Sequence, residues 1–272
     1  SLGSRGLGDV YKRQAKRMFP DLAEDDAQAR LAEAIFMASR VNAEDPVASW
    51  KTHNQTLKEK REWLNQKDFK EIHFKGPGTD LKVGLADDHE WMGGASMAQN
   101  GVICNPNIPS EEVFTTPHAL RVEGYVSSTK PLSHQGTLID NIRVVFEKGS
   151  ITDAKASKGE TVLKKVLESD EGARRLGEVA LVPNSSPISN SGLLFYNTLF
   201  DENAACHIAL GQCYSKCFKG ETNLSTSEIR ERGGNSSMIH IDWMIGSGEI
   251  DIDGFGKNGE IVPIFRKGEW VD

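Results

Sequence analysis

A short apolar stretch carries two ionisable side chains two residues apart: Met238-Ile239-His240-Ile241-Asp242-Trp243. Its β-branched and aromatic residues favour a strand. On a strand, side chains at positions i and i+2 share a face, so the imidazole of His240 and the carboxylate of Asp242 project side by side. Burying both is costly unless a positive charge lies between them, and a divalent metal ion is the simplest candidate. A surface strand would give the same alternation, so this segment alone leaves both interpretations open.

Earlier in the chain, other apolar segments are also interrupted by acidic or imidazole side chains: Ser110–Pro117 with Glu112, Gly177–Pro183 with Glu178, and Asp201–Gly211 with Glu202 and His207. Tyr214, a potential hydrogen-bond donor, follows His207. Each member has an ordinary alternative: Glu178 paired with Arg174 or Arg175, Glu202 as a helix cap, and His207 as a satisfied core histidine. As a set, several carboxylates with two imidazoles suit divalent ions, and two ions better than one.

At these residues the chain resembles the thermophilic-metalloprotease or M29 family of metallo-aminopeptidases. The resemblance rests on the segments EEVFTTP, GE, DENAACH and HID, together with Tyr214. It extends from about Lys16 to the C-terminus. The resemblance implies a two-metal site built from Glu112, Glu178, Glu202, His207, His240 and Asp242. It also places Tyr214 close to the reacting carbonyl. It also implies a homodimer in the full-length form.

The resemblance sets the expected domain organisation. Family members carry an additional N-terminal region, so we expect this sequence to be the C-terminal portion of a longer enzyme. Residues 1–14 show no hydrophobic period and no signal-peptide core, and we interpret them as a non-native leader. Residues 15–70 are predicted to be the helical remainder of a truncated N-terminal region, and residues 71–272 the metallo-aminopeptidase catalytic domain.

The sequence pattern predicts an α+β fold. Helical spacing of apolar residues predicts helices over 27–41 and over 46–69, the second started by Asp45-Pro46. A β-hairpin is predicted over 71–85, with its turn at 76–78. Strands then predominate, with one helix over 161–168 and strands that include 120–127, 139–148 and 193–196.

Because this order lacks a regular β-α-β alternation, we predict a mixed catalytic domain with a helical N-terminal part and a strand-rich, metal-binding C-terminal part. The polar segment 184–192 is predicted to be a flexible loop beside the substrate entrance.

Composition excludes several functional classes. The 272 residues carry a net charge of −7 and are 38% hydrophobic, with no basic cluster of the kind that binds nucleic acid and no apolar run long enough to span a membrane. The four cysteines lack the CxxC pairs of a structural zinc site. We therefore expect reduced thiols in a cytoplasmic protein, with Cys206 and Cys213 as small buried hydrophobes.

The expected activity is release of N-terminal amino acids from peptides by water activated between two metal ions. Glu112 and Glu178 are both candidates for the general base, and Tyr214 is expected to bond the tetrahedral intermediate. Zinc or cobalt is expected, with manganese or magnesium as alternatives. Glu111 is expected to be exposed or bound to the backbone rather than a metal ligand. The alternatives are a two-metal hydrolase of esters or amides, and a catalytically silent fragment.

Overall fold

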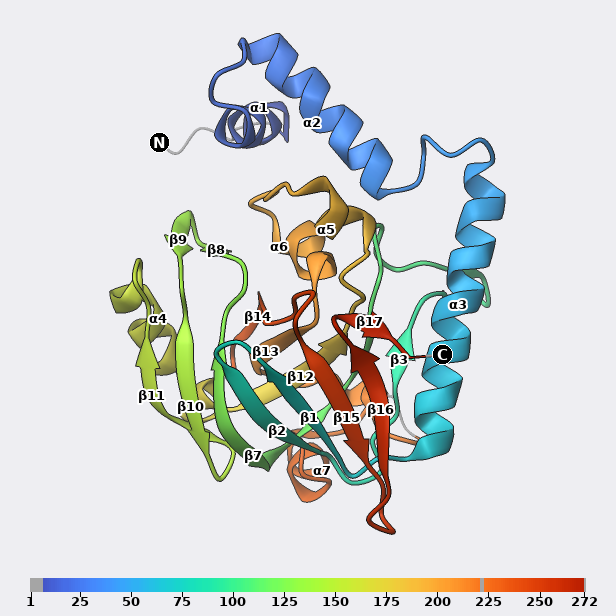
Figure 1. Ribbon diagram of the computed structural model, residues 1–272, viewed down its shortest axis with the longest axis vertical. Coiled ribbons are helices and arrows are strands. Elements are labelled where there is room, and N and C mark those ends of the chain that lie inside the picture. Colours follow the sequence, from blue (N-terminus) through green and yellow to red (C-terminus); the bar gives the residue numbers. More distant parts are fainter. Residues whose placement is uncertain (1–6, 221–222, 272) are drawn as a thin grey trace.

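The computed structural model describes residues 7–220 and 223–271 and shows two large antiparallel sheets, with two small two-stranded ones, beside a helical arm (Figure 1). The arm consists of α1 (Leu7–Met18), α2 (Glu24–Ala38) and α3 (Pro46–Lys67). Asp45 caps α3 by accepting a hydrogen bond from the backbone N–H of Ala48, and Pro46 occupies the first turn, so the predicted start of this helix is confirmed. The two helices predicted for this region are both present.

The predicted boundary between residues 14 and 15 lies inside α1. Tyr11, Ala15 and Met18 are spaced as one face of a helix, and they pack into a cluster with α2. The hydroxyl of Tyr11 donates to the carbonyl of Gln28 at 3.0 Å. Residues 11–14 therefore do have a helical period, contrary to our interpretation, while residues 1–6 lie outside the described part. The non-native origin of the leader stays a prediction.

The larger sheet has eight strands in the order β11, β10, β7, β2, β1, β15, β16, β17. Their bounds are Ser150–Lys155, Arg143–Glu147, Pro117–Ser127, Thr79–Leu85, Glu71–Gly76, Asp251–Phe255, Ile261–Arg266 and Glu269–Trp270. The predicted hairpin is confirmed as β1 and β2, which pair from Glu71 opposite Gly84 to Gly76 opposite Thr79. Gly78 has a φ of 73° in the turn, a conformation that glycine adopts without strain.

The smaller sheet has five strands in the order β14, β13, β12, β6, β3, and it carries most of the candidate site residues. Their bounds are His240–Met244, His207–Gly211, Leu176–Leu181, Val113–Thr115 and Met92–Gly93. The two sheets share one core, in which Phe74 and Val83 of the larger sheet belong to the same cluster as Val179, Ile208 and Trp243 of the smaller. This packing fixes the strands that hold the site.

The remaining elements are short and complete the α+β fold that the sequence predicts. They are β4 (Ser96–Met97), β5 (Ile103–Cys104), β8 (Leu132–His134), β9 (Thr137–Ile139), α4 (Glu160–Leu167), α5 (Pro187–Ser191), α6 (Thr198–Asp201), α7 (Thr226–Glu231), and the 3-10 helices η1 (Glu171–Arg174), η2 (Glu202–Ala204) and η3 (Ser215–Cys217). The helix predicted over 161–168 is confirmed as α4. Figure 1 shows α5 and α6 between the helical arm and the sheets.

Three local predictions were wrong. Residues 193–196 form no strand, because the backbone N–H of Phe195 donates at 2.6 Å to the Asp201 carboxylate, a side chain, rather than to a neighbouring strand. The strand predicted over 139–148 is interrupted between β9 and β10, where Asn141 has a φ of 49°. The predicted loop 184–192 contains α5, whose first turn is capped by Ser186.

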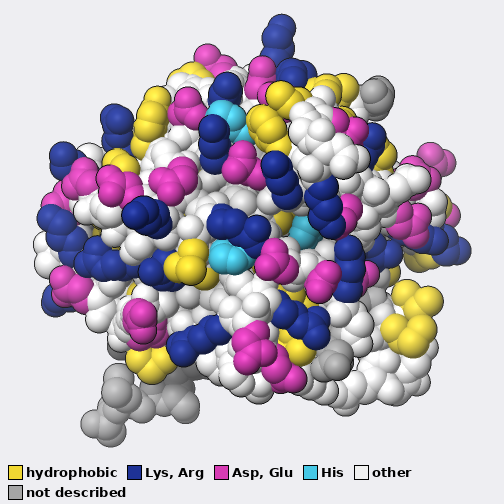
Figure 2. Space-filling view, turned by 90° about the horizontal axis from the view of Figure 1, so that it is seen from below, with side chains coloured by type: hydrophobic (Ala, Val, Ile, Leu, Met, Phe, Trp, Pro, Cys, Tyr) yellow, Lys and Arg dark blue, Asp and Glu magenta, His cyan; other side chains and the backbone are white. Residues whose placement is uncertain are grey.

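Figure 2 shows acidic and basic side chains interspersed over the face seen from below, without a field of one sign. Within residues 7–220 and 223–271, no helix combines the length and apolar character that crossing a membrane requires.

Candidate metal centre

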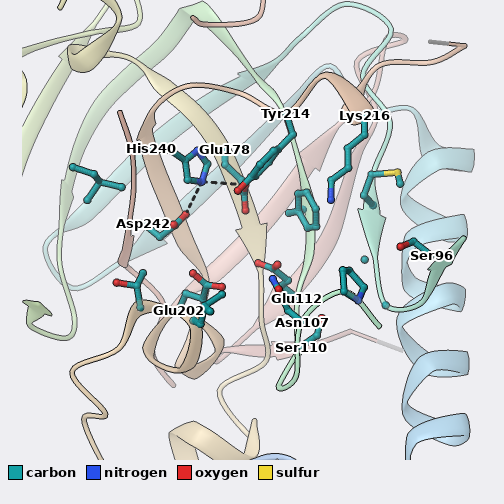
Figure 3. Close-up of a pocket in the computed structure, with 18 of the residues that line it drawn as sticks. Ser96, Asn107, Ser110, Glu112, Glu178, Glu202, Tyr214, Lys216, His240 and Asp242 are labelled. Atoms are coloured by element: carbon teal, nitrogen blue, oxygen red, sulfur yellow. Dashed lines mark ion pairs between the residues drawn. The ribbon is translucent and has the colours of Figure 1, made fainter. Parts of the chain in front are cut away.

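A cavity of about 520 Å³ brings the predicted site residues together. Its lining includes Glu112, which precedes β6, Glu178 on β12, and Glu202 at the start of η2. His240 and Asp242 of β14 line it too, as does Tyr214, and Figure 3 shows these side chains converging on one space. None of residues 184–192 lines this cavity, and their predicted place beside the substrate entrance stays a prediction.

Two groups of potential ligand atoms lie within the cavity region. Glu112, Glu178 and His207 form one group, and Glu178, His240 and Asp242 form the other; within each group the atoms lie within 4.8 Å of one another. Glu178 belongs to both groups. Glu202 lines the same cavity without joining either group. The arrangement can hold two cations that share one carboxylate, since carboxylates and imidazoles are common ligands of divalent ions.

His207, the first residue of β13, is buried and oriented by the backbone. Its Nδ1 lies 3.1 Å from the carbonyl oxygen of Ala205, so the neutral ring carries its proton there. Its Nε2 then presents a lone pair 3.0 Å from Glu112 Oε2 and 3.7 Å from Glu178 Oε1. A ring nitrogen fixed in this way is the usual form of a metal-binding histidine.

His240 repeats this arrangement on the neighbouring strand. Its Nδ1 lies 2.7 Å from the carbonyl oxygen of Gln212, which fixes the same tautomer. Its Nε2 faces Asp242 Oδ1 at 3.3 Å and Glu178 Oε2 at 3.7 Å. The two carboxylate oxygens of Glu178 therefore face different imidazoles, and Figure 3 shows the contacts of His240 as dashed lines.

Several polar atoms of this cluster are buried without a hydrogen-bond partner. They are Glu112 Oε2, Glu178 Oε2 and His207 Nε2. Buried polar groups in native proteins are nearly always satisfied, and leaving one unpaired costs about 1–3 kcal/mol. A divalent cation between these atoms would satisfy all of them, so the residues present fit a metal ion.

Crowding of like charges perturbs the carboxyl groups. Burial, together with the neighbouring Glu112 and Asp242, raises the pKa of Glu178 to about 7. The same causes raise the pKa of Glu202 to about 9. Burial disfavours the charged form of His240, yet the adjacent Asp242 carboxylate raises its pKa to about 9. The raised carboxyl pKa values thus reflect repulsion between neighbouring carboxylates, which a cation would relieve.

The alternatives that the sequence allowed for Glu178 are not found. Arg174 and Arg175 donate instead to backbone carbonyls, those of Ile151 and of Ala119 and Lys148 respectively. Cys206 and Cys213 are buried, as predicted.

Glu111 belongs to neither ligand group, as predicted, but its predicted surroundings are corrected, because it is neither exposed nor bound through its side chain to the backbone. It is buried and forms an ion pair with Arg40, the first contact of the site that sequence reasoning missed. The sequence signal for this contact was the Glu111-Glu112 doublet. Adjacent side chains of an extended segment point to opposite sides, so the two carboxylates face different surroundings. Lys216, which also lines the cavity, was missed as well.

Comparison with known proteins places the chain in a family. The profile of the family described as Thermophilic metalloprotease (M29) matches residues 11–270. This chain belongs to the M29 family. The resemblance inferred from the separate motifs is thereby confirmed over nearly the whole sequence.

Named relatives within the M29 family are aminopeptidases. Aminopeptidase T of Thermus aquaticus is 55% identical over 257 residues, which cover 94% of this chain and 62% of the relative. Aminopeptidase AmpS of Bacillus subtilis is 47% identical, over 97% of this chain and 65% of the relative. The structure called wild-type AmpT from Thermus thermophilus superposes with a TM-score of 0.88 at 52% identity, covering 95% of this chain and 62% of that one. The chain thus spans less than two thirds of these relatives.

Proposed function

We propose that this M29 chain is a metal-dependent aminopeptidase that releases N-terminal amino acids from peptides. The single observation that carries the proposal is the pair of ligand groups that share Glu178, in a chain whose named relatives are aminopeptidases. Two divalent ions, zinc or cobalt, are proposed, and the shared carboxylate supports two sites rather than one. Glu112 and His207 would hold one ion, His240 and Asp242 the other, and Glu202 would complete the set.

Metal ions bound here would polarise the scissile carbonyl and lower the pKa of a bound water. The protein's own groups bind the substrate and transfer the protons. The acidic cluster attracts the α-ammonium of a peptide and so confines cleavage to the chain end. Glu112 and Glu178 are the two candidates for the carboxylate that accepts a proton from water and returns it to the leaving amine. Tyr214, whose ring lies 4.8 Å from that of His240, directs its hydroxyl group to the reacting carbonyl.

The cellular setting follows from the same proposal. Four free cysteines, of which Cys104 is exposed, suit a reducing compartment, and we propose the cytoplasm. Homodimerisation of the full-length form stays a prediction from the family resemblance.

The decisive experiment measures metal content and activity on the same purified chain. Elemental analysis should find about two ions per chain, and hydrolysis of leucine p-nitroanilide should stop on adding a chelator and return on adding zinc or cobalt. His240→Ala and Asp242→Ala should lose both metal and activity. The matched control is His118→Ala, because His118 lies at a separate surface cavity and should leave both unchanged.

Each other outcome has a defined meaning. Two bound ions with hydrolysis of esters, but not of aminoacyl amides, would replace the peptidase assignment with a different hydrolase. A chain without metal and without hydrolysis would indicate a catalytically silent fragment. To assign the base, Glu112→Gln and Glu178→Gln are compared: the true base is the residue whose variant loses kcat while retaining its metal.

A further inference from the structure

The cavity has a cationic side as well as an acidic one. Lys216 lines it, and Figure 3 shows the side chain directed into the same space as the carboxylates. Its ammonium nitrogen lies 5.0 Å from the ring centre of Phe114 and 5.2 Å from that of Tyr214. These two aromatic faces hold the cation by charge–quadrupole attraction.

Lys216 forms none of the ion pairs found in the described part of the chain, where Lys164, Lys219 and Lys257 each pair with a carboxylate. A contact with an aromatic face does not use up the three N–H donors of an ammonium group. The donors of Lys216 are therefore available to an anionic group that enters the cavity.

Lys216 and the metal ligand His240 both lie beside the ring of Tyr214. The Tyr214 ring lies 5.2 Å from the Lys216 ammonium and 4.8 Å from the His240 ring, so a single aromatic side chain separates the cation from the metal ligands. An extended chain spans roughly 3.5 Å per residue, or about 7 Å for two residues. A dipeptide with its α-ammonium at the acidic cluster would extend its carboxylate towards the Lys216 side.

We propose that Lys216 binds the free C-terminal carboxylate of dipeptide substrates and so makes dipeptides the preferred substrate class. This inference rests on the proposed aminopeptidase function. Its chemistry is a charge-assisted hydrogen bond from an ammonium group that lines the cavity of about 520 Å³. Arg61 lines the same cavity and donates to the carbonyl of Gly93 at 3.4 Å.

The test compares the hydrolysis of Leu-Gly with that of Leu-Gly amide by the metal-loaded chain. In Lys216→Met, kcat/KM for Leu-Gly should fall roughly tenfold to hundredfold, the usual effect of losing a hydrogen bond to a charged group. The same substitution should change kcat/KM for the amide less than about twofold, because the amide has no C-terminal carboxylate that Lys216 could bind. Lys216→Arg should retain most of the preference for the acid.

The control is Lys82→Met, which removes the same charge from an exposed position on β2 and should change neither substrate. An equal loss on both substrates would overturn the proposal, because it would show that Lys216 only supports Tyr214. A third substrate, Leu-Asp amide, carries its carboxylate on the side chain. If dependence on Lys216 appeared with that substrate alone, the assignment to the C-terminus would be wrong.

A binding measurement keeps the inference separate from the proposed function. Calorimetric titration of Leu-Gly and of its amide into the metal-free chain requires no hydrolysis. Wild type should bind the acid more tightly than the amide, and Lys216→Met should bind both equally. Absence of hydrolysis with every substrate would count against the aminopeptidase proposal, whereas equal binding of acid and amide by wild type would overturn the role of Lys216.

Discussion

Glu111 and Arg40 form a buried ion pair that joins the helical arm to the candidate metal centre. Their side chains are 4% and 15% exposed, and Arg40 Nη2 lies 2.8 Å from Glu111 Oε2. The backbone N–H of Glu111 donates to Asn203 Oδ1 at 2.6 Å, and His53 Nε2 donates to the carbonyl of Ser110 at 2.7 Å. Because Glu112 follows Glu111 and Glu202 precedes Asn203, this network positions two of the cavity's carboxylates.

Replacing Arg40 by Met should destabilise the metal-free chain by about 3–5 kcal/mol, because it leaves the Glu111 carboxylate buried without its partner. Urea unfolding at pH 7 measures this change. The affinity for metal should fall as well, since Glu112 loses its fixed neighbour. The double variant Arg40→Met/Glu111→Leu should recover part of the lost stability, because no charge remains buried.

The matched control for this pair is Arg30→Met. Arg30 pairs with Glu33 on α2, but both side chains are more than half exposed, at 59% and 60%. An exposed pair contributes about 0–1 kcal/mol, so this variant should unfold close to wild type. Equal losses in Arg40→Met and Arg30→Met would show that burial of the Glu111 pair has no special effect.

Much of the site was predictable because its residues break local patterns. His240 and Asp242 stand two apart on a strand, and Glu178 interrupts an apolar run that proves to be the fully buried strand β12. Burial of ionisable groups in such strands is costly, so a pattern that tolerates it indicates function. The family resemblance then predicted that these separate segments form one site.

The parts that sequence reasoning missed depend on contacts between distant segments. Arg40 and Glu111 are far apart in the chain, and nothing near either residue indicates the other. Lys216 looks like an ordinary surface lysine until Phe114 is brought beside it by the pairing of β6 with β12. Local patterns also cannot show that the Asp201 carboxylate accepts a hydrogen bond from the backbone N–H of Phe195 and so prevents a strand there.

Replacing Glu202 by Gln should change stability and metal binding in opposite directions. Burial and the neighbouring carboxylates raise the pKa of Glu202 from 4.5 to about 9. At pH 7 this carboxyl is ionised in the unfolded chain and protonated in the folded one, so it costs stability, and Gln removes the cost. The metal-free chain should gain on the order of 3 kcal/mol at pH 7, and metal affinity should fall.

Urea unfolding with a chelator and metal titration on the same sample check this pair of effects. The sign of the pH dependence provides a further check. Because the folded pKa is raised, wild type loses stability as pH rises from about 4.5 towards 9, and Glu202→Gln should lose less over that range. A variant that is destabilised without metal would contradict the electrostatic explanation.

Replacing Tyr214 by Phe should lower kcat without removing metal. The ring packs edge-on to Phe114 at 6.0 Å and beside His240 at 4.8 Å, and Phe preserves both contacts while removing the hydroxyl group. Loss of one donor to a developing oxyanion typically costs about 10²–10³ in kcat. Kinetics on leucine p-nitroanilide, with elemental analysis alongside, tests this role. Unchanged kcat would make Tyr214 a packing residue only.

His89 should make the chain less stable in mild acid. It is buried, with Nδ1 3.0 Å from the carbonyl oxygen of Ala86, and burial lowers its pKa from 6.5 to about 4. Because the unfolded chain binds the proton more readily, the contribution of His89 is complete above pH 6.5 and is lost as pH falls towards 4. The loss amounts to about 3 kcal/mol.

Comparison with His89→Asn isolates this contribution, because the Asn amide keeps a donor near the Ala86 carbonyl and does not titrate. Urea unfolding of both proteins between pH 4 and 7 in the presence of a chelator gives the two stability curves, and the other titrating groups cancel in their difference. Wild type should lose its advantage over the variant as pH falls, since only wild type must exclude a proton from a buried imidazole. Parallel curves would show that His89 accepts its proton without cost, and burial would then not control its pKa.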